Sequence, residues 1–524
     1  MKMVKSLILG SAAGLIALGG AQAADLPLKA KAVEYVKVCS LYGAGFFYIP
    51  GTDTCIKLGG YLRIDTTFNG GIYDQPAWSG DLGQGNRFAN YYATRSRMAL
   101  TVDTRTATDY GVVRTFAQGD FNFDTLGNST FSPNSLNTTL GNNGNLLSTA
   151  GGGYVTVENV FIQFAGFTFG KSASAYATPW QGYAGNQNTS FLIGGQDTVT
   201  GVNNIQYTAQ FGNGLSGTIG LDDPTVYNRT ALYNLSDGLN AVGQNTPSGA
   251  YGGVRAPDVV GNFRIDQAWG LFQLSGALHL VNGSYNTLGA DDTPVAGTTA
   301  LTDSVLSGHP ASKWGGSIQA AVQVRNLPTG AGDDIKFDAS YAVGDTKNVI
   351  STSSASPSFA MFGGGSAGTV GNVAFGATTD GVYLPTLAGG DGAIHLTTAY
   401  GIRGAFNHNW DPYWSSSLFG GMGWVNYDGT AKTEYCNTYY TGIGVANRAT
   451  STCNPNYSIS MLGVITRWTP VKNLTFSAET IWTHLNTGFT GTAVLAPAAP
   501  LPTGVYQFKD QNTVSFNVRA QRNF

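Results

Sequence analysis

Charged residues are scarce in this chain. They make up 11% of its 524 residues, whereas typical soluble domains carry about 25%. The formal net charge is −3, so the chain also lacks the basic excess that nucleic-acid-binding proteins use to neutralise phosphates. The composition therefore argues against an ordinary charged surface, and nucleic acid is not an expected partner.

Long hydrophobic runs are also missing after residue 23. A membrane-spanning helix needs about 20 predominantly apolar residues, and no later segment supplies them. Yet the mean hydropathy is close to neutral, at −0.05. Such a chain must spread its apolar residues thinly, and its 72 glycines, 26 tyrosines and 27 phenylalanines fit alternating strands joined by turns. That composition is typical of an outer-membrane β-barrel.

Cysteine is limited to four residues, which form two local pairs, Cys39 with Cys55 and Cys436 with Cys453. A zinc site is the alternative, but it would favour closely spaced CxxC-like pairs, which are absent. An even number of cysteines in an exported protein favours disulfides. Each disulfide would close a short loop and contribute about 3 kcal/mol in the chain-entropy model.

The first 23 residues have the pattern of a secretory signal peptide. Lys2 and Lys5 precede an apolar segment at 7–18, and the sequence Ala-Gln-Ala at 21–23 is a small-x-small cleavage site. A transmembrane helix is the alternative, but the apolar run is too short and too rich in glycine and alanine. We predict a signal peptide at 1–23, followed by a lead with a cysteine-stapled segment at 24–58.

From Gly59 onward the chain alternates between polar and apolar residues. Arg63 and Asp65 would share one face of a strand, and Leu62 and Ile64 the other. The same period recurs to the last residue and predicts about 16 strands within 59–524. Later examples are 334–343, 395–410 and 414–427. Short connections alternate with long ones, such as 344–394 and 428–457, as in barrels with short periplasmic turns and long extracellular loops.

One long segment, 172–203, has no period. It follows a tight hairpin at 161–170, FIQFAGFTFG, and is rich in small residues and amides. Loops of this length inside a compact domain are uncommon and often functional. We predict that it folds into the barrel and narrows it, with Tyr176, Trp180 and Tyr183 as bulky side chains.

Three motifs resemble the alphaproteobacterial porin family. Residues 33–61, VEYVKVCSLYGAGFFYIPGTDTCIKLGGY, resemble its N-terminal signature, including both cysteines. The hairpin 161–170 resembles the strand pair before an inward-folded third loop. The last strand, which ends on Phe524, resembles the signal read by the outer-membrane barrel assembly machinery. The resemblance covers essentially the whole mature chain.

The resemblance implies an all-β fold, a 16-stranded antiparallel transmembrane barrel. It also implies a homotrimer in the Gram-negative outer membrane, in contact with its lipid and lipopolysaccharide. The implied function is passive diffusion of small hydrophilic solutes and ions through a water-filled channel. A substrate-selective channel of the same fold, for sugars or small anions, is the first alternative, and an exported β-rich adhesin without a channel is another.

Selectivity in such pores depends on diameter and on the charges that line it. In the family, basic residues on early strands face acidic residues of the third loop. The matching positions here are Arg63, Arg95, Arg97 and Arg114, although some could be solvated charges at the rim. The third loop has a single acid, Asp197, which could instead cap a turn at the loop's base.

Catalysis is not expected, and neither a cofactor nor a metal site is predicted. The five histidines show no metal-ligand spacing, and no GxSxG motif accompanies them. These histidines are His279, His309, His395, His408 and His484.

Overall fold

The computed structural model describes residues 37–71, 92–124, 153–180, 182–189, 192–197, 200–224, 228–245, 249–286, 307–350, 358–497 and 501–524. The predicted signal peptide at 1–23 and residues 24–36 of the predicted lead lie outside the described residues. No helix in the described ranges is long and apolar enough to cross a membrane.

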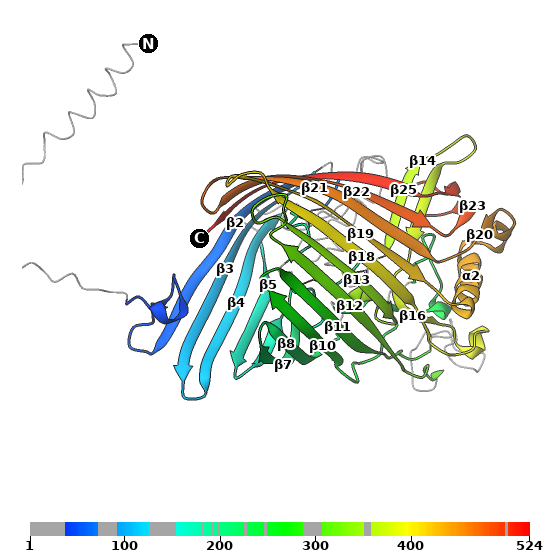
Figure 1. The fold of residues 1–524 in the computed structure, drawn as a ribbon. Coiled ribbons are helices and arrows are strands. Elements are labelled where there is room, and N and C mark those ends of the chain that lie inside the picture. The colour runs from blue at the N-terminus through cyan, green and yellow to red at the C-terminus, as the bar shows by residue number, and fades with distance from the viewer. Residues whose placement is uncertain are drawn as a thin grey trace, which may run out of the picture.

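Sixteen antiparallel strands form a closed barrel (Figure 1). Each strand pairs with the next wall strand along the chain, and the sheet closes where the first strand pairs with the last, from Tyr61 opposite Asn523 to Phe68 opposite Phe516. Closure leaves no unpaired sheet edge. The wall strands are β2 (Thr54–Phe68), β3 (Tyr92–Thr108), β4 (Gly111–Asp124), β5 (Tyr154–Phe164), β6 (Phe167–Ser172), β7 (Val202–Gly212), β8 (Leu215–Asp222), β10 (Asp258–Gln267), β11 (Gly270–Val281), β12 (Lys313–Arg325), β13 (Asp334–Val343), β18 (Thr398–Asn409), β19 (Trp414–Asn426), β21 (Tyr457–Val471), β22 (Leu474–Thr487) and β25 (Gln511–Asn523).

The two faces of the wall follow the period-two pattern of the sequence. In β3, Arg95 and Arg97 are buried on the inner face, whereas Met98 and Leu100 are exposed on the outer face. Successive strand residues point to opposite sides, so the apolar residues form the outer surface and the polar ones line the interior. This confirms the predicted barrel.

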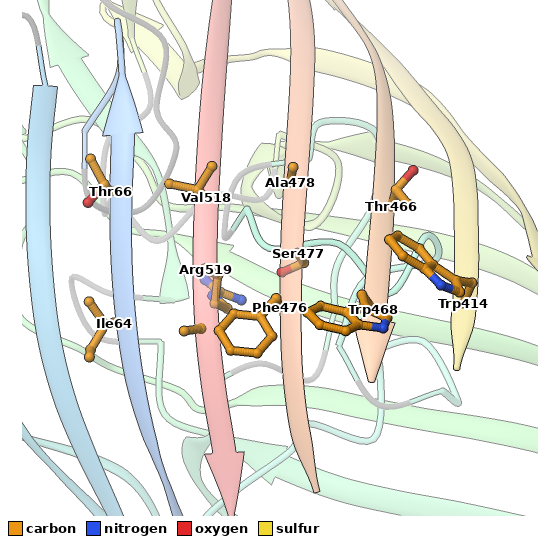
Figure 2. Close-up of a pocket in the computed structure, with 11 residues that line it drawn as sticks. Ile64, Thr66, Trp414, Thr466, Trp468, Phe476, Ser477, Ala478, Val518 and Arg519 are labelled. Carbon is orange, nitrogen blue, oxygen red and sulfur yellow. The ribbon is translucent and has the colours of Figure 1, made fainter. Parts of the chain in front are cut away.

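Aromatic side chains gather on the outer face across β19, β21 and β22. Trp414 stacks on Trp468 with 5.9 Å between ring centroids, and Phe476 lies 5.7 Å beyond Trp468. They line one groove together with other residues, among them Ile64, Ala478 and Val518 (Figure 2). Aromatic girdles of this kind lie at the membrane–water interfaces of outer-membrane barrels.

The barrel begins earlier than the sequence indicated. The first wall strand starts at Thr54 rather than Gly59, because residues 54–58 already pair with β3 and with a short strand, β1 (Phe47–Tyr48). A disulfide between Cys39 and Cys55 links the segment before β1 to the wall strand β2. At the same end the backbone N–H of Phe524 donates to the carbonyl of Gly60 at 3.1 Å, which extends the seam to the last residue.

The long loops at the other end of the barrel fold into a cap (Figure 1). Its sheets have the orders β14-β15-β24-β23-β20 and β17-β16-β9. The cap strands are β9 (Ala231–Asn234), β14 (Phe359–Gly364), β15 (Gly371–Gly376), β16 (Thr379–Tyr383), β17 (His395–Leu396), β20 (Ser451–Thr452), β23 (Thr490–Leu495) and β24 (Gly504–Phe508), with one α-helix, α2 (Gly429–Ile443). Single 3-10 turns are η1 (Ser40–Tyr42), η5 (Leu235–Asp237), η7 (Thr346–Asn348), η8 (Thr386–Ala388) and η9 (Val445–Ala449).

Apart from β17, these cap elements lie in segments that were expected to be loops. Residues 428–457 contain α2, which is tied to the segment after it by the Cys436–Cys453 disulfide. The predicted strand 395–410 is two elements, because His395 belongs to β17 and pairs with the cap strand β16. Buried aromatic residues of the cap, such as Phe375, Tyr439 and Phe508, belong to a core cluster that also includes the wall residues Ile459 and Leu485.

Candidate functional site

The third loop, residues 173–201, runs inside the barrel along its wall. It leaves β6 and returns to β7, and in between it contacts the inner faces of strands from β10 round to β25. Wall side chains donate to its backbone carbonyls along its length, for example Asn262 to Ala175, Gln273 to Ala177, Arg264 to Pro179, Asn407 to Ala184, Arg467 to Gly185 and Arg403 to Gln196. The loop is therefore anchored by its backbone to polar side chains of the wall.

The far end of the loop is fixed by two opposite charges. The carboxylate of Glu479 accepts hydrogen bonds from the backbone N–H groups of Asn188 and Thr189, at 2.6 and 3.0 Å. Arg519 donates to the carbonyl of Asn188 at 2.9 Å. Hydrogen bonds to charged groups are the stronger kind. The wall supplies the charges, so the loop needs few of its own, and this accounts for its single acid.

The three aromatic residues predicted to narrow the channel are buried. Tyr176, Trp180 and Tyr183 are at most 7% exposed. Tyr176 packs with Val260 and Ala277 of the wall, and the other two join the main core cluster. These side chains fill the space between loop and wall, and they set how far the loop stands from the wall instead of lining the bore.

Asp197 lies away from the early-strand arginines. Its carboxylate is 3.7 Å from the guanidinium of Arg403 on β18, which also binds Asp338 of β13 at 3.0 Å. Lys347 of η7 is buried close by, and burial lowers its pKa to about 8 against the opposing attraction of Asp197 and Asp380. Asp197 is thus part of a buried charge cluster where the loop meets the wall and the cap.

Three of the predicted arginines lie on neighbouring strands at one level of the wall. Arg95 is 2.8 Å from the carboxylate of Asp65, and Arg97 is 2.8 Å from that of Asp120. Arg63 donates to Gln521 at 2.8 Å. The arginines are therefore held by polar partners on the wall itself.

The fourth arginine lies at a different level. Arg114 binds Asp103 at 3.0 Å, and in the sheet register it is opposite Arg105, eight positions along β3 from Arg97. Eight residues of strand span about 27 Å. Arg114 therefore lies near the short-turn end of the barrel, far from the other three.

Of the three acids beside these arginines, only Asp65 was expected from the strand alternation to share their face, and Asp120 and Glu158 were missed. Arg95 and Arg519 both pair with Asp65, and Arg97 pairs with Asp120 and Glu158. Asp120 has the same strand parity as Arg114, a signal that the alternation already carried. Glu158 could not be placed that way, because it is the extra residue of a bulge where the β4–β5 register shifts, and bulges re-aim side chains.

Comparisons with known proteins agree with this architecture. Residues 25–517 match the family model described as Porin subfamily. Porin Omp2b of Brucella canis and Porin Omp2b of Brucella abortus are each 34% identical over 276 residues, which cover 51% of this chain and 63% of the relative. The alignment thus spans less than two thirds of those relatives.

Among solved structures, the outer membrane channel DcaP of Acinetobacter baumannii superimposes with a TM-score of 0.53 at 13% identity. The match covers 91% of this chain and 99% of the channel. At this identity the likeness supports the fold alone.

Proposed function

We propose that this chain, which belongs to the porin subfamily and lies in the Gram-negative outer membrane, forms a water-filled channel for passive diffusion of small hydrophilic solutes and ions. The observation that carries the proposal is a closed barrel of sixteen strands with a charged, hydrogen-bonded inner face and an apolar outer face. Sixteen-stranded barrels are wide enough for an aqueous channel. The chain acts as a channel and not as an enzyme.

In this proposal the third loop sets the width of the channel, which is narrowest beside the part of the loop that lies farthest from β6 and β7. The loop follows the wall from β10 to β25, so the passage narrows between the loop and the opposite strands, β3 to β5. Arg95, Arg97 and Arg519 pair with three carboxylates in that region. Arg63 and Asp124 lie on the same strands beside them, so positive and negative formal charges among the described residues there balance. We therefore expect sorting mainly by size, with weak preference between cations and anions.

A sugar-selective channel receives less support. A sugar slide would need aromatic faces open to the passing solute, whereas Trp180 and Tyr183 are packed beneath the loop. Liposome swelling with sugars of increasing size separates the two functions. Rates that fall smoothly with size support general diffusion, and saturable uptake of one sugar contradicts it.

The proposal also covers the molecules that this chain contacts in the outer membrane and during its assembly. We infer a homotrimer whose outer faces meet membrane lipid and lipopolysaccharide, and whose terminal strand is read by the barrel assembly machinery. The strand ends on Phe524, and its backbone pairing with Gly60 places that residue at the barrel seam. Cross-linking of the protein in native outer membranes tests the trimer, and a purely monomeric product would contradict it.

Conductance in planar bilayers tests the channel itself. Purified protein should give step-like openings, and their absence would contradict the proposal. Arg97→Gln leaves Asp120 and Glu158 with one cation fewer, so the reversal potential in a salt gradient should move toward cation preference. Arg114→Gln is the matched control, because its guanidinium lies far from the narrow region. An equal shift in both variants would place the selective region elsewhere.

A further inference from the structure

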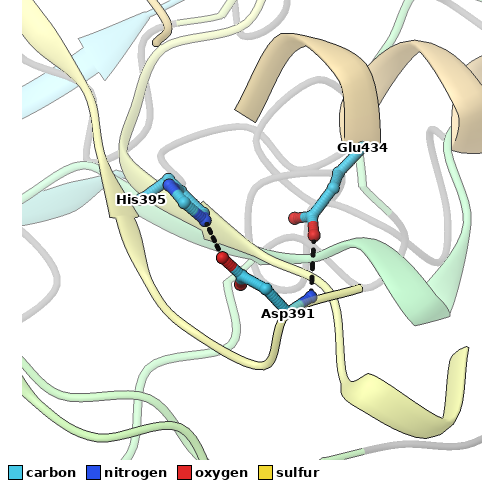
Figure 3. A group of neighbouring side chains, drawn as sticks. All are labelled: Asp391, His395 and Glu434. Carbon is cyan, nitrogen blue, oxygen red and sulfur yellow. Dashed lines mark hydrogen bonds and ion pairs between the residues drawn. The ribbon is translucent and has the colours of Figure 1, made fainter. Parts of the chain in front are cut away.

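A histidine and two acids meet in the cap, outside the barrel interior. His395 of β17 faces Asp391, which precedes it in the chain, and Glu434 of helix α2 (Figure 3). One ligand atom from each of the three residues can be chosen so that all lie within 4.8 Å of one another. Two loops of the cap, the segment before β17 and the segment that forms α2, thus contribute to one cluster.

One carboxylate oxygen of Glu434 has no hydrogen-bond partner among the described residues. One carboxylate oxygen accepts from the backbone N–H of Asp391 at 3.1 Å. The other is buried, without a hydrogen-bond partner in the described part of the chain, and points toward His395 (Figure 3). The residue is only 7% exposed, and burial raises the pKa of its carboxyl. A buried carboxylate oxygen without a partner is costly, and a bound cation would offset that cost.

His395 is held between two carboxylates. Its Nε2 lies 3.0 Å from Asp391, and its Nδ1 lies 3.1 Å from Asp428. A neutral imidazole has only one N–H and can satisfy one of these two acceptors. If Nε2 binds a cation, Nδ1–H still donates to Asp428, which is the carboxylate–histidine–metal arrangement common in metal sites.

Asp428 is itself fixed in place for this role. It is the N-cap of α2, and its other oxygen accepts from the backbone N–H of Ala431 at 2.7 Å. Lys313 attracts Asp391, whereas Asp391 and Asp428 act on Glu434 as like charges. The cluster is therefore acidic and rigid on its helix side.

We propose that Asp391, His395 and Glu434 bind a divalent transition-metal ion of the Zn²⁺ type, with Asp428 as the positioning residue for the imidazole. An imidazole nitrogen with carboxylate oxygens suits zinc, whereas Ca²⁺ and Mg²⁺ prefer sites made of oxygen alone. Three protein ligands leave a position for water. The ion would join two loops of the cap, a role that is separate from diffusion through the barrel.

Metal binding to the purified full-length protein in detergent tests the proposal. After chelation and dialysis, titration calorimetry with Zn²⁺ should show one ion bound per chain. Co²⁺ bound in place of Zn²⁺ should give the visible absorption of an ion with a low coordination number. His395→Gln and Glu434→Gln should each weaken zinc binding by more than about tenfold. Asp428→Asn should weaken zinc binding by about 10- to 100-fold. The matched controls are His309→Gln and Asp510→Asn, which change a histidine and an acid elsewhere among the long loops.

The results that would overturn the proposal are equally specific. They are no saturable binding at millimolar zinc, equal affinity in His395→Gln and the parent, or Ca²⁺ binding as tightly as Zn²⁺. Asp391→Asn is a further ligand variant. Because the side chain of Asp391 is exposed, its replacement should weaken zinc binding without misfolding of the cap. Bilayer conductance of the same preparations is measured separately, so loss of zinc binding with intact openings would not be confused with failure of the channel.

Discussion

The barrel wall and the cap are built in different ways from the same chain. In the wall each strand pairs with its neighbour in sequence, and every pair of neighbouring strands is antiparallel. In the cap, β15 pairs in parallel with β24, and β16 pairs in parallel with β9, across more than a hundred residues. Pairing of sequence neighbours leaves a local pattern in the sequence, whereas pairing of distant segments does not.

The two regions also differ in what lies inside them. The inner face of the wall carries arginines, acids and amides, whereas clustered aromatic rings pack the interior of the cap. Phe375 lies 4.5 Å from Phe489 and 6.0 Å from Phe508, measured between ring centroids. A change in the wall should therefore disturb closure of the barrel, and a change in the cap should disturb packing alone.

The largest effect is expected from removal of Phe524. Its backbone closes the seam against Gly60, and the residue ends the strand that we propose is read during assembly. We expect a several-fold fall in folded barrel in the outer membrane, measured by heat-modifiable migration on gels, while export to the periplasm continues. Tyr110→Ala, which changes an exposed aromatic at a short turn, is the control and should leave the yield unchanged. Equal yields of both variants would remove Phe524 from the assembly signal.

The wall could be predicted from the sequence because lipid and the interior impose opposite demands on alternate residues. The predicted strand 334–343 coincides with β13, and 414–427 differs from β19 by one residue. The cap escaped prediction because its strands are short, and because some of them, such as β9 and β16, are buried on both faces, so that alternation is lost. Helix α2 follows Asp428, a capping signal that went unused in a segment interpreted as a loop.

The interior shows the same limit. Parity along a strand placed Arg95 and Arg97 on the inner face, but it could not say which acids would meet them. Asp197 was the only acid of the third loop, yet the fold brings it to Arg403, some 200 residues away in sequence. Likewise, the cluster of Asp391, His395 and Glu434 combines two loops, so no ligand spacing could reveal it.

A change in the cap core should give the next largest effect. Phe375→Ala removes a ring from the aromatic cluster, and such substitutions cost about 3–5 kcal/mol. We expect the cap to open at lower denaturant, detected by proteolysis of the long loops, while the barrel keeps its folded migration. Val494→Ala, at an exposed position of the same sheet, is the control. Unfolding of cap and barrel together in Phe375→Ala would show that they form one cooperative unit.

The Cys436–Cys453 disulfide should contribute somewhat less. It joins α2 to the segment beside β20, and replacing both cysteines by alanine should lower the stability of the cap by about 3 kcal/mol. Hydrogen exchange at α2 measures the effect. The matched change at Cys39 and Cys55 should leave exchange at α2 unaltered, because that disulfide lies at the other end of the barrel. Faster exchange at α2 in both double variants would contradict a local role.

The last effect is confined to alkaline pH and comes from Lys347, which lies where the two regions meet. It follows wall strand β13, and its charge is attracted to Asp197 of the third loop and Asp380 of the cap. Burial lowers its pKa from 10.5 to about 8 in the folded chain. Between these two values the unfolded chain holds one proton more than the folded chain, so stability should rise with pH across that range.

The comparison with Lys347→Met isolates this contribution from the many other groups that titrate above pH 8. Methionine keeps much of the side-chain volume but has no charge to bury. Denaturant midpoints of the cap should therefore rise more steeply in the parent than in the variant from about pH 8 to 10.5. Below pH 8 the parent carries the full cost of a buried ammonium, and the variant should be the more stable. Parallel curves would mean that the attraction of Asp197 and Asp380 cancels that cost, and that charge stabilises the junction between wall and cap as it does the wall.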